Sequence, residues 1–163
     1  MPQPAIDFYA ILQLLSGANV KYVVIGGVAM HLHGANNLTV DMDISFSRDR
    51  ENANALAIAL STQNARLRGI PADLPCIVDA HVLRSTTNLT LETVIGDFDL
   101  LAEPAGVDSF EGLWNRAVVM DVDGIKVHVS SIDDLIAMKR VADRPKDREH
   151  ILELEALKAT KGS

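Results

Sequence analysis

The chain has 163 residues, of which 48% are hydrophobic, and its 15 basic and 22 acidic residues give a formal net charge of −7. This length suits one compact domain, residues 1–163, with a sizeable core. The acidic balance argues against a protein that coats nucleic acid or an anionic membrane through bulk charge. A single cysteine, Cys76, excludes an intrachain disulfide and a cysteine-based zinc knuckle.

The sequence also predicts a cytoplasmic protein without a membrane span. The first residues include no basic region, and Asp7 interrupts the apolar stretch that follows them, which argues against a secretory signal. Residues 22–40 contain no Asp, Glu, Lys or Arg, but their glycines, histidines and asparagines make this segment too polar to cross a bilayer.

The N-terminal part of the chain is predicted to alternate helices with strands. Apolar residues recur at near-helical spacing before Gly17, and a β-branched run then ends at Gly26-Gly27. The predicted elements are a helix over 5–17, a buried strand over 21–25, a short helix over 28–33 and an alternating strand over 40–47.

The rest of the chain continues this α/β (α+β) mixture. Asp123-Gly124 is a strong hairpin signal, Ser131 and Asp134 form a capping box, and Pro145 suits the first position of a last helix. The predicted elements are a helix over 50–66, a loop over 69–75, strands over 89–95 and 98–101, a helix over 108–117, strands over 118–122 and 125–129, and helices over 131–143 and 145–157.

The most informative segment is the strand around Asp41 and Asp43. Its even positions are all apolar, whereas its odd positions carry two carboxylates and Ser45, so the carboxylates share one face about 7 Å apart. Like charges this close raise each other's pKa, and a divalent cation is the simplest group to sit between them. The competing interpretation is a solvated edge strand.

Two further features favour the cation. Gly26-Gly27 ends a buried strand and opens a helix, where free N–H groups attract phosphate, although many such pairs are only tight turns. Asp97 and Asp99 flank Phe98 on another strand, which would supply a third carboxylate for a two-metal clamp. Taken alone, this second pair is better explained as the polar face of a hairpin.

Gly26-Gly27, thirteen intervening residues and Asp41-x-Asp43 resemble the signature of the nucleotidyltransferase superfamily, which has the DNA polymerase β-like fold. The resemblance is to small bacterial members of the AbiEii-like and minimal nucleotidyltransferase type. It extends over most of the chain through Gly96–Leu101, Leu135–Arg140 and Arg144–Asp147. It implies a mixed sheet flanked by helices, with a core over about 20–130 and a C-terminal helical pair over about 131–157.

The resemblance also implies roles for particular residues. Metal ligands, for Mg²⁺ or Mn²⁺, would be Asp41, Asp43 and Asp99. The nucleoside triphosphate (NTP) would contact Gly26 and Gly27, and Lys139 and Asp147 match positions that related toxins need for activity. Lys139 shares a helical stripe with apolar residues, so it either reaches into a cleft, where it would also bind the nucleotide, or snorkels to the surface.

One departure from the pattern concerns phosphate binding. Relatives commonly carry arginine where this chain has Asn37, and residues 22–47 contain no Lys or Arg. Arg144, Lys146 and Arg148 alternate with acidic residues and are interpreted as a solvated face. His33 is assigned to packing or to a helix end, and Cys76 is assigned to structure.

The leading hypothesis is an enzyme that moves a nucleoside monophosphate from an NTP to a hydroxyl of a tRNA, a protein or a small molecule, with release of pyrophosphate. ATP is one candidate donor, and the enzyme would be a candidate toxin of a toxin–antitoxin pair. The alternative is an inactive module of the same fold that binds a cognate partner as an antitoxin. A phosphatase with an Asp-x-Asp nucleophile is disfavoured, because a strand, a turn and a helix precede the motif.

Overall fold

The computed structural model describes residues 7–37 and 41–161. Helices and strands alternate along this part of the chain. The helices are α1 (Phe8–Gly17), α2 (Gly26–Leu32), α3 (Arg50–Ser61), α4 (Ala80–Ser85), α5 (Phe110–Arg116), α6 (Ile132–Ala142) and α7 (Pro145–Lys161). The strands are β1 (Tyr22–Ile25), β2 (Met42–Phe46), β3 (Arg66–Leu67), β4 (Asn88–Glu92), β5 (Phe98–Leu101), β6 (Val118–Val122) and β7 (Ile125–Val129).

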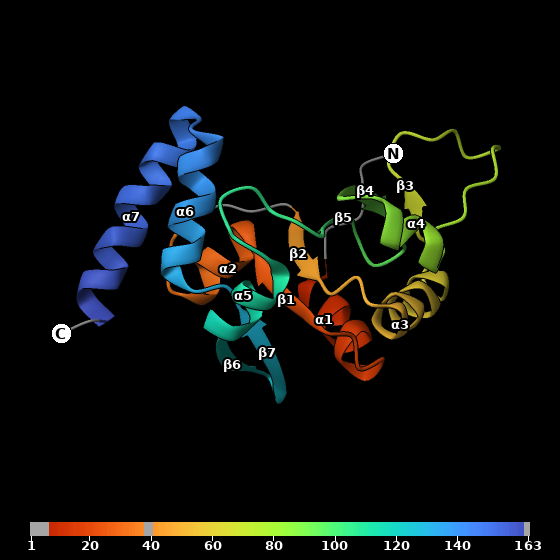
Figure 1. The fold of residues 1–163 in the computed structure, drawn as a ribbon, viewed down its shortest axis with the longest axis horizontal. Coiled ribbons are helices and arrows are strands. Elements are labelled where there is room, and N and C mark those ends of the chain that lie inside the picture. Colours follow the sequence, from red (N-terminus) through yellow and green to blue (C-terminus); the bar gives the residue numbers. More distant parts are fainter. Residues whose placement is uncertain (1–6, 38–40, 162–163) are drawn as a thin grey trace.

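The strands of the described residues form one mixed sheet in the order β3-β4-β5-β2-β1-β7-β6. The pairs β1–β7 and β2–β5 are parallel, and the other neighbours are antiparallel. Helices α6 and α7 lie side by side at one end of the molecule, while α3 and α4 lie at the other (Figure 1). The predicted mixed sheet flanked by helices, with a C-terminal helical pair, is confirmed.

The central strand β1 is buried on both faces of the sheet. Tyr22 and Val24 belong to the main core, whereas Val23 and Ile25 pack with Phe110 and Leu113 of α5. All four β1 residues are buried, which explains why this strand reads as a continuous apolar run. The face that carries Val23 and Ile25 is the one that also carries the site described below.

Strand β2 shows the predicted alternation. Met42, Ile44 and Phe46 belong to the main core, and each is at most 1% exposed. Asp43 and Ser45 therefore point to the opposite face. Strand β5 repeats the pattern, with Phe98 and Leu100 in the core and Asp99 on the other face. The core thus fixes which way the carboxylates point.

Helix ends and turns follow the local sequence. Ser131 Oγ accepts a hydrogen bond from the Asp134 N–H at 3.1 Å, and Pro145 begins α7. Asp123 and Gly124 both have positive φ, at 49° and 93°, as a two-residue hairpin turn of this kind requires. His33 caps the C-terminal end of α2, and its Nε2 lies 2.8 Å from the Ser130 carbonyl oxygen. These four predictions are confirmed.

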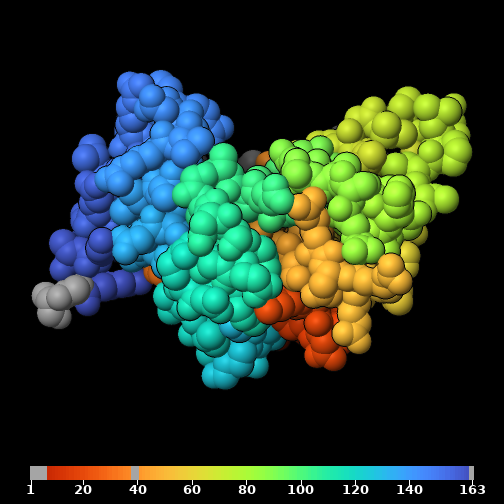
Figure 2. Space-filling model, viewed as in Figure 1, coloured from red at the N-terminus to blue at the C-terminus, as the bar shows by residue number. Residues whose placement is uncertain are grey.

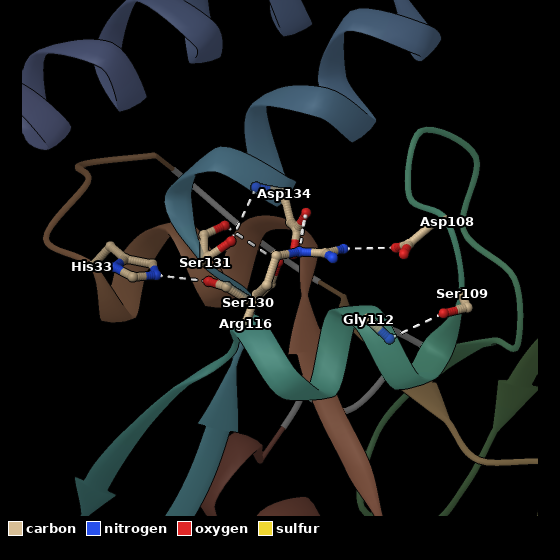
Figure 3. A network of polar contacts seen from close by, with 8 residues as sticks. All are labelled: His33, Asp108, Ser109, Gly112, Arg116, Ser130, Ser131 and Asp134. Carbon is tan, nitrogen blue, oxygen red and sulfur yellow. Dashed lines mark hydrogen bonds and ion pairs between the residues drawn. The ribbon is translucent and has the colours of Figure 1, made fainter.

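A polar network fixes α6 against α5. The Arg116 guanidinium at the end of α5 lies between Asp134 of α6 and Asp108, which precedes α5 (Figure 3). Arg116 Nε lies 2.9 Å from Asp134 Oδ2, and Arg116 Nη2 lies 2.8 Å from Asp108 Oδ1. Since α6 carries Lys139, this network also positions the wall of the site.

Two predicted helix ends are wrong, the strand predicted over 89–95 ends at Glu92, and one helix was not predicted. The helix predicted over 50–66 ends at Ser61, because Asn64 takes a positive φ of 52° and the chain then turns into β3. Helix α4 was not predicted, although the Asp79 carboxylate caps it by accepting from the Val82 N–H. Helix α7 continues to Lys161, beyond the predicted end at Leu157. Residues 5 and 6 of the first predicted helix, and Val40 of the acidic strand, lie outside the described residues.

Within residues 7–37 and 41–161, no helix is both long enough and apolar enough to span a membrane.

Candidate active site

Two carboxylates meet on neighbouring parallel strands. The register pairs Asp43 of β2 with Asp99 of β5, and it continues the row to Ile25 on β1 and to Thr90 on β4. Directly opposed residues lie on the same face of a sheet, so these four side chains form one row across four strands. The sequence predicted each carboxylate on its own strand, and the pairing of β2 with β5 brings them together.

The pKa values of both carboxyl groups are raised. Burial raises the pKa of Asp43 to about 7, and the charge of Asp99 and a hydrogen bond with it act in the same direction. Burial also raises the pKa of Asp99, against the opposing charge of Arg68. The charge of Asp41 pushes both pKa values further up, while that of Lys139 lowers the pKa of Asp43. A carboxylate pair of this kind needs a proton or a cation between its members.

Gly26 makes room for Asp43. Its φ is +68°, a value that favours glycine, and a Cβ at this position would overlap Oδ2 of Asp43. Helix α2 begins at Gly26, directly after β1, as the Gly26-Gly27 pair predicted. The glycine is therefore required by the close approach of backbone and carboxylate, beyond any need for a tight turn.

A cleft of about 410 Å³ opens above this row. One wall is the sheet face, with Asp43, Asp99, Asn88 and Thr90, and the opposite wall is formed by α6 and the start of α7. The surface is hollowed between the blue C-terminal helices and the lime-coloured segment at the other side of the molecule (Figure 2). Apolar residues complete the lining: Ile25, Leu101, Pro104, Ala105, Leu135, Met138, Val141 and Ala142.

Lys139 faces this cleft and does not snorkel to the surface. Its side chain is only 14% exposed, and its Nζ lies 3.3 Å from Asp147 Oδ1. Asp147 is fully buried and also accepts from Arg144, whose Nε lies 2.6 Å from Oδ2. Burial alone would raise the pKa of Asp147, but the Arg144 hydrogen bonds and the Lys139 charge outweigh it and lower the pKa to about 2. Asp147 therefore remains ionised and holds both cations at the cleft.

Arg144 has a second role besides the predicted one. Its side chain is 57% exposed, as the predicted solvated face requires, and it also lines the cleft beside Lys139. Hydrogen bonding to Asp147 raises the pKa of Arg144, and the negative charge of Asp43 across the cleft adds to this effect. The alternation of charges in the sequence gave no sign of this second role, because the contact with Asp147 at the edge of the cleft depends on the turn between α6 and α7.

Arg68 is the residue that the sequence gave no reason to select. It directly follows β3, and its Nη2 lies 3.2 Å from Asp99 Oδ1 while its Nε lies 3.6 Å from Asp97 Oδ2. Because β3 was predicted as the end of a helix, Arg68 had no assigned place in the sheet. To select Arg68 from the sequence, one would have to predict that β3 pairs with β4, and a strand of two residues leaves no recognisable sequence pattern.

The remaining sequence-selected residues lie close to the carboxylate pair. Asp41 precedes β2 at a bend and affects both carboxylates through its charge. Gly27 is the second residue of α2, and its carbonyl accepts from Asn37 Nδ2 at 3.2 Å. Asn37 therefore folds back onto the glycine pair. No partner for Asn37 Oδ1 is found among the described residues.

The donor set suits a divalent cation bound through two carboxylates. Across residues 7–37 and 41–161, no three His, Cys, Asp or Glu side chains are grouped as metal ligands. Asp43 and Asp99 do meet, however, and a cation between them would relieve the repulsion that, after burial, raises the pKa of Asp43. Mg²⁺ commonly binds through one or two protein carboxylates and completes its shell with substrate phosphates and water. Participation of Asp41 as a third ligand stays a prediction.

Comparisons with known proteins identify a family for this chain. The model of a family described as "Nucleotidyltransferase of unknown function (DUF6036)" matches residues 7–161. Among curated proteins, none matches the chain.

Several solved structures share the fold at low sequence identity. The lincosamide antibiotic adenylyltransferase LnuA, with lincomycin bound, superposes with a TM-score of 0.62 at 15% identity, over 94% of this chain and 99% of that one. ANT(2'')-Ia in complex with adenylyl-2''-tobramycin gives 0.56 at 16% identity, over 93% and 92%. An antigenic nucleotidyltransferase-like protein from Paracoccidioides brasiliensis gives 0.54 at 18% identity, over 91% and 73%. The chain thus has the nucleotidyltransferase fold.

Proposed function

Because the chain belongs to the nucleotidyltransferase family DUF6036, we propose that it transfers a nucleoside monophosphate from a nucleoside triphosphate to an acceptor hydroxyl. The acceptor oxygen forms a bond to the α-phosphorus, the bond from that phosphorus to the β-phosphate oxygen breaks, and pyrophosphate leaves. The observation that carries the proposal is the meeting of Asp43 and Asp99 at the cleft, opposite Lys139.

The carboxylate pair is the proposed cation site. Asp43 and Asp99 would hold Mg²⁺ or Mn²⁺, with Asp41 as a further ligand. A divalent cation bound there supplies a Lewis acid that lowers the pKa of the acceptor hydroxyl and offsets the charge developing on the α-phosphate. Gly26 allows Asp43 to approach the start of α2, where the backbone N–H groups of Gly26 and Gly27 would contact the triphosphate.

Lys139 and Arg144 are the proposed cationic partners of the triphosphate. Both line the wall opposite the carboxylates and are held there by Asp147, so their positions are set before a ligand arrives. Asp147 is fully buried and acts as a positioning residue for these two cations. These two cations would take over the phosphate contact of the arginine that the family resemblance leads us to expect at Asn37.

The acceptor would lie along the sheet side of the cleft. Asn88 and Thr90 project from the exposed face of β4 next to Asp99, and both offer neutral hydrogen-bonding groups. Apolar residues of β5 and α6 adjoin them and would cover the less polar part of a ligand. The solved relatives with lincomycin and adenylyl-2''-tobramycin motivate hydroxylated small molecules as the first acceptors to examine.

The test is transfer of label from each α-labelled nucleoside triphosphate with Mg²⁺ or Mn²⁺. Three acceptor pools separate the substrate classes: total tRNA, a protein extract and a set of hydroxylated antibiotics. We expect pyrophosphate release and labelling in one pool, and loss of both in Asp43→Asn and Asp99→Asn. Asp121→Asn is the matched control, because Asp121 lies in the β6–β7 hairpin and pairs with Lys126.

Label transfer that survives Asp43→Asn would rule out the carboxylate pair as the reaction centre. If no triphosphate binds in calorimetry and none reacts with any pool, the transferase proposal is wrong, and the inactive binding module becomes the better account.

A further inference from the structure

Arg68 lies on the opposite side of Asp99 from Asp43. The sheet order β3-β4-β5-β2 places Asp99 on β5 between Arg68, which follows β3, and Asp43 on β2. A carboxylate has two oxygens and can bind two different partners at once. Arg68 Nη2 lies 3.2 Å from Oδ1 of Asp99, so the guanidinium binds this carboxylate from the β4 side.

The backbone of Arg68 is fixed to the sheet. Its N–H donates to the Thr90 carbonyl at 2.9 Å, directly beside the Asp99 register position. The loop that follows is closed by Arg66, whose Nη2 donates to the carbonyls of Pro71 at 2.9 Å and Leu74 at 2.6 Å. Hydrogen bonds therefore hold both the Arg68 backbone, from which the guanidinium extends, and the loop after it.

The guanidinium is shared between two carboxylates of the β5 region. Besides Asp99, it contacts Asp97, with 3.6 Å between Nε and Oδ2. The Asp97 and Asp99 side chains are only 17% and 21% exposed, so both are partly shielded from water. The contact with Asp97 is an ion pair only, because Arg68 Nε is buried and has no hydrogen-bond partner among the described residues. Arg68 Nη2 also donates to the Leu91 carbonyl at 3.5 Å. Together these contacts restrain the guanidinium beside Asp99.

We propose that Arg68 is a positioning residue that holds Asp99 oriented for cation binding with Asp43. This inference rests on the proposed function, in which Asp43 and Asp99 bind the cation. Carboxylates that bind metals are commonly held by hydrogen bonds from a second layer of residues, and loss of such a partner typically weakens metal binding about 10–100-fold.

Charge alone predicts the opposite result. A positive group beside a cation site repels the cation, so removal of Arg68 would tighten binding if Arg68 acted only through its charge. The same is expected if the guanidinium merely occupied the place of the cation. The sign of the change therefore separates positioning from repulsion and from competition.

The test measures the Kd of Mn²⁺ for the full chain by electron paramagnetic resonance of free Mn²⁺, with and without a non-hydrolysable nucleoside triphosphate. We expect Arg68→Gln to weaken Mn²⁺ binding by about 10-fold or more. Arg68→Lys keeps the charge but lacks the planar fork, so it should also weaken binding, by a smaller factor. Arg84→Gln is the charge-matched control, because Arg84 is an exposed residue of α4 bonded to the Arg48 carbonyl. Its Kd should equal that of the wild type.

The outcomes separate this inference from the proposed function. If the wild type binds Mn²⁺, Asp43→Asn does not, and Arg68→Gln binds as tightly as the wild type or more tightly, only the positioning role is overturned. If the wild type binds no Mn²⁺ under either condition, the cation site itself is wrong, and the role of Arg68 is overturned with it. Thermal unfolding in EDTA confirms that each variant is folded, and a purely structural role would lower the Tm without changing the Kd of the folded protein.

Discussion

Gly26 shows how a single backbone position controls the candidate site. Its positive φ makes a larger residue strained, and its contact with Asp43 leaves no room for a Cβ. The sequence identified Gly26-Gly27 as a turn that opens a helix. The contact with Asp43 could not be read from the sequence, because it depends on the antiparallel pairing of β1 with β2, which sets Ile25 opposite Asp43.

Gly26→Ala should abolish nucleotidyl transfer, because the new Cβ would displace the Asp43 carboxylate. Gly124→Ala is the matched control, since Gly124 also has a positive φ, of 93°, but has open space around its Cβ position. Both variants should lose about 1 kcal/mol of stability from the unfavourable φ. Only Gly26→Ala should also lose Mn²⁺ binding. Equal Mn²⁺ affinity in the two variants would contradict the steric role of Gly26.

Individual site residues differed in how far the sequence could predict them. Asp43 and Asp99 were predictable because each alternates with apolar core residues on its own strand, a purely local pattern. Arg68 was not, because its role depends on a strand of only two residues and on carboxylates about thirty positions later in the chain. Arg144 was assigned to a solvated face, and it is exposed, but its place beside the cleft depends on the packing of α7 against α6.

At the scale of elements, the junction of α6 and α7 forms one wall of the cleft. Asp143 ends α6 with a left-handed φ of 47°, and Pro145 starts α7 directly afterwards. The Asp147 carboxylate then accepts from the Arg144 N–H at 3.1 Å, which caps the start of α7. The same side chain binds Lys139 of α6, so one buried carboxylate joins the two helices.

Because of Asp147, the free energy of unfolding should decrease at acid pH. Its folded-state pKa of about 2 lies below the ordinary 3.8, so its stabilisation is complete above about 4 and is lost as the pH falls through 2. Asp147→Asn should therefore cost about 2 kcal/mol at pH 7, which lowers the Tm by about 4–8 °C. Thermal unfolding from pH 2 to 7 checks this, and the difference from wild type should shrink toward pH 2.

Glu155→Gln is the control for this series. It removes the exposed Arg140–Glu155 pair between the same helices, which should contribute at most about 1 kcal/mol. If Asp147→Asn costs no more than Glu155→Gln at pH 7, the buried carboxylate does not join α6 to α7 as described.

On the scale of the whole molecule, the fold holds carboxylates together at a cost in stability. The raised pKa of Asp43, about 7 against the ordinary 3.8, means that the folded chain binds this proton more tightly than the unfolded chain. The stability gained from this proton is present below about 4 and is lost as the pH rises through 7. Above that pH the metal-free protein holds an ionised, partly buried Asp43 beside Asp99, as is common where function requires acidic groups to lie close together.

Asp43→Asn should therefore stabilise the metal-free protein at pH 8. We expect a gain of at least about 1 kcal/mol, or about 2–4 °C in Tm, in the presence of EDTA, and a smaller gain at pH 5. Mn²⁺ should raise the Tm of the wild type but leave that of Asp43→Asn unchanged. A metal-free Asp43→Asn protein less stable than the wild type at pH 8 would show that the carboxylate pair carries no such cost.

The sequence by itself determined the α/β mixture, most strands and helices, and the faces on which Asp43, Asp99 and Lys139 lie. These features depend on periodicity, capping and turn residues, which act between positions only a few residues apart. Only the tertiary structure decided which strands are neighbours, and hence that Asp99 meets Asp43 on one side and Arg68 on the other. It also placed Arg144 at the cleft, through the turn that joins α6 to α7. Strand order and helix packing bring distant residues together through non-local burial, which local patterns do not encode.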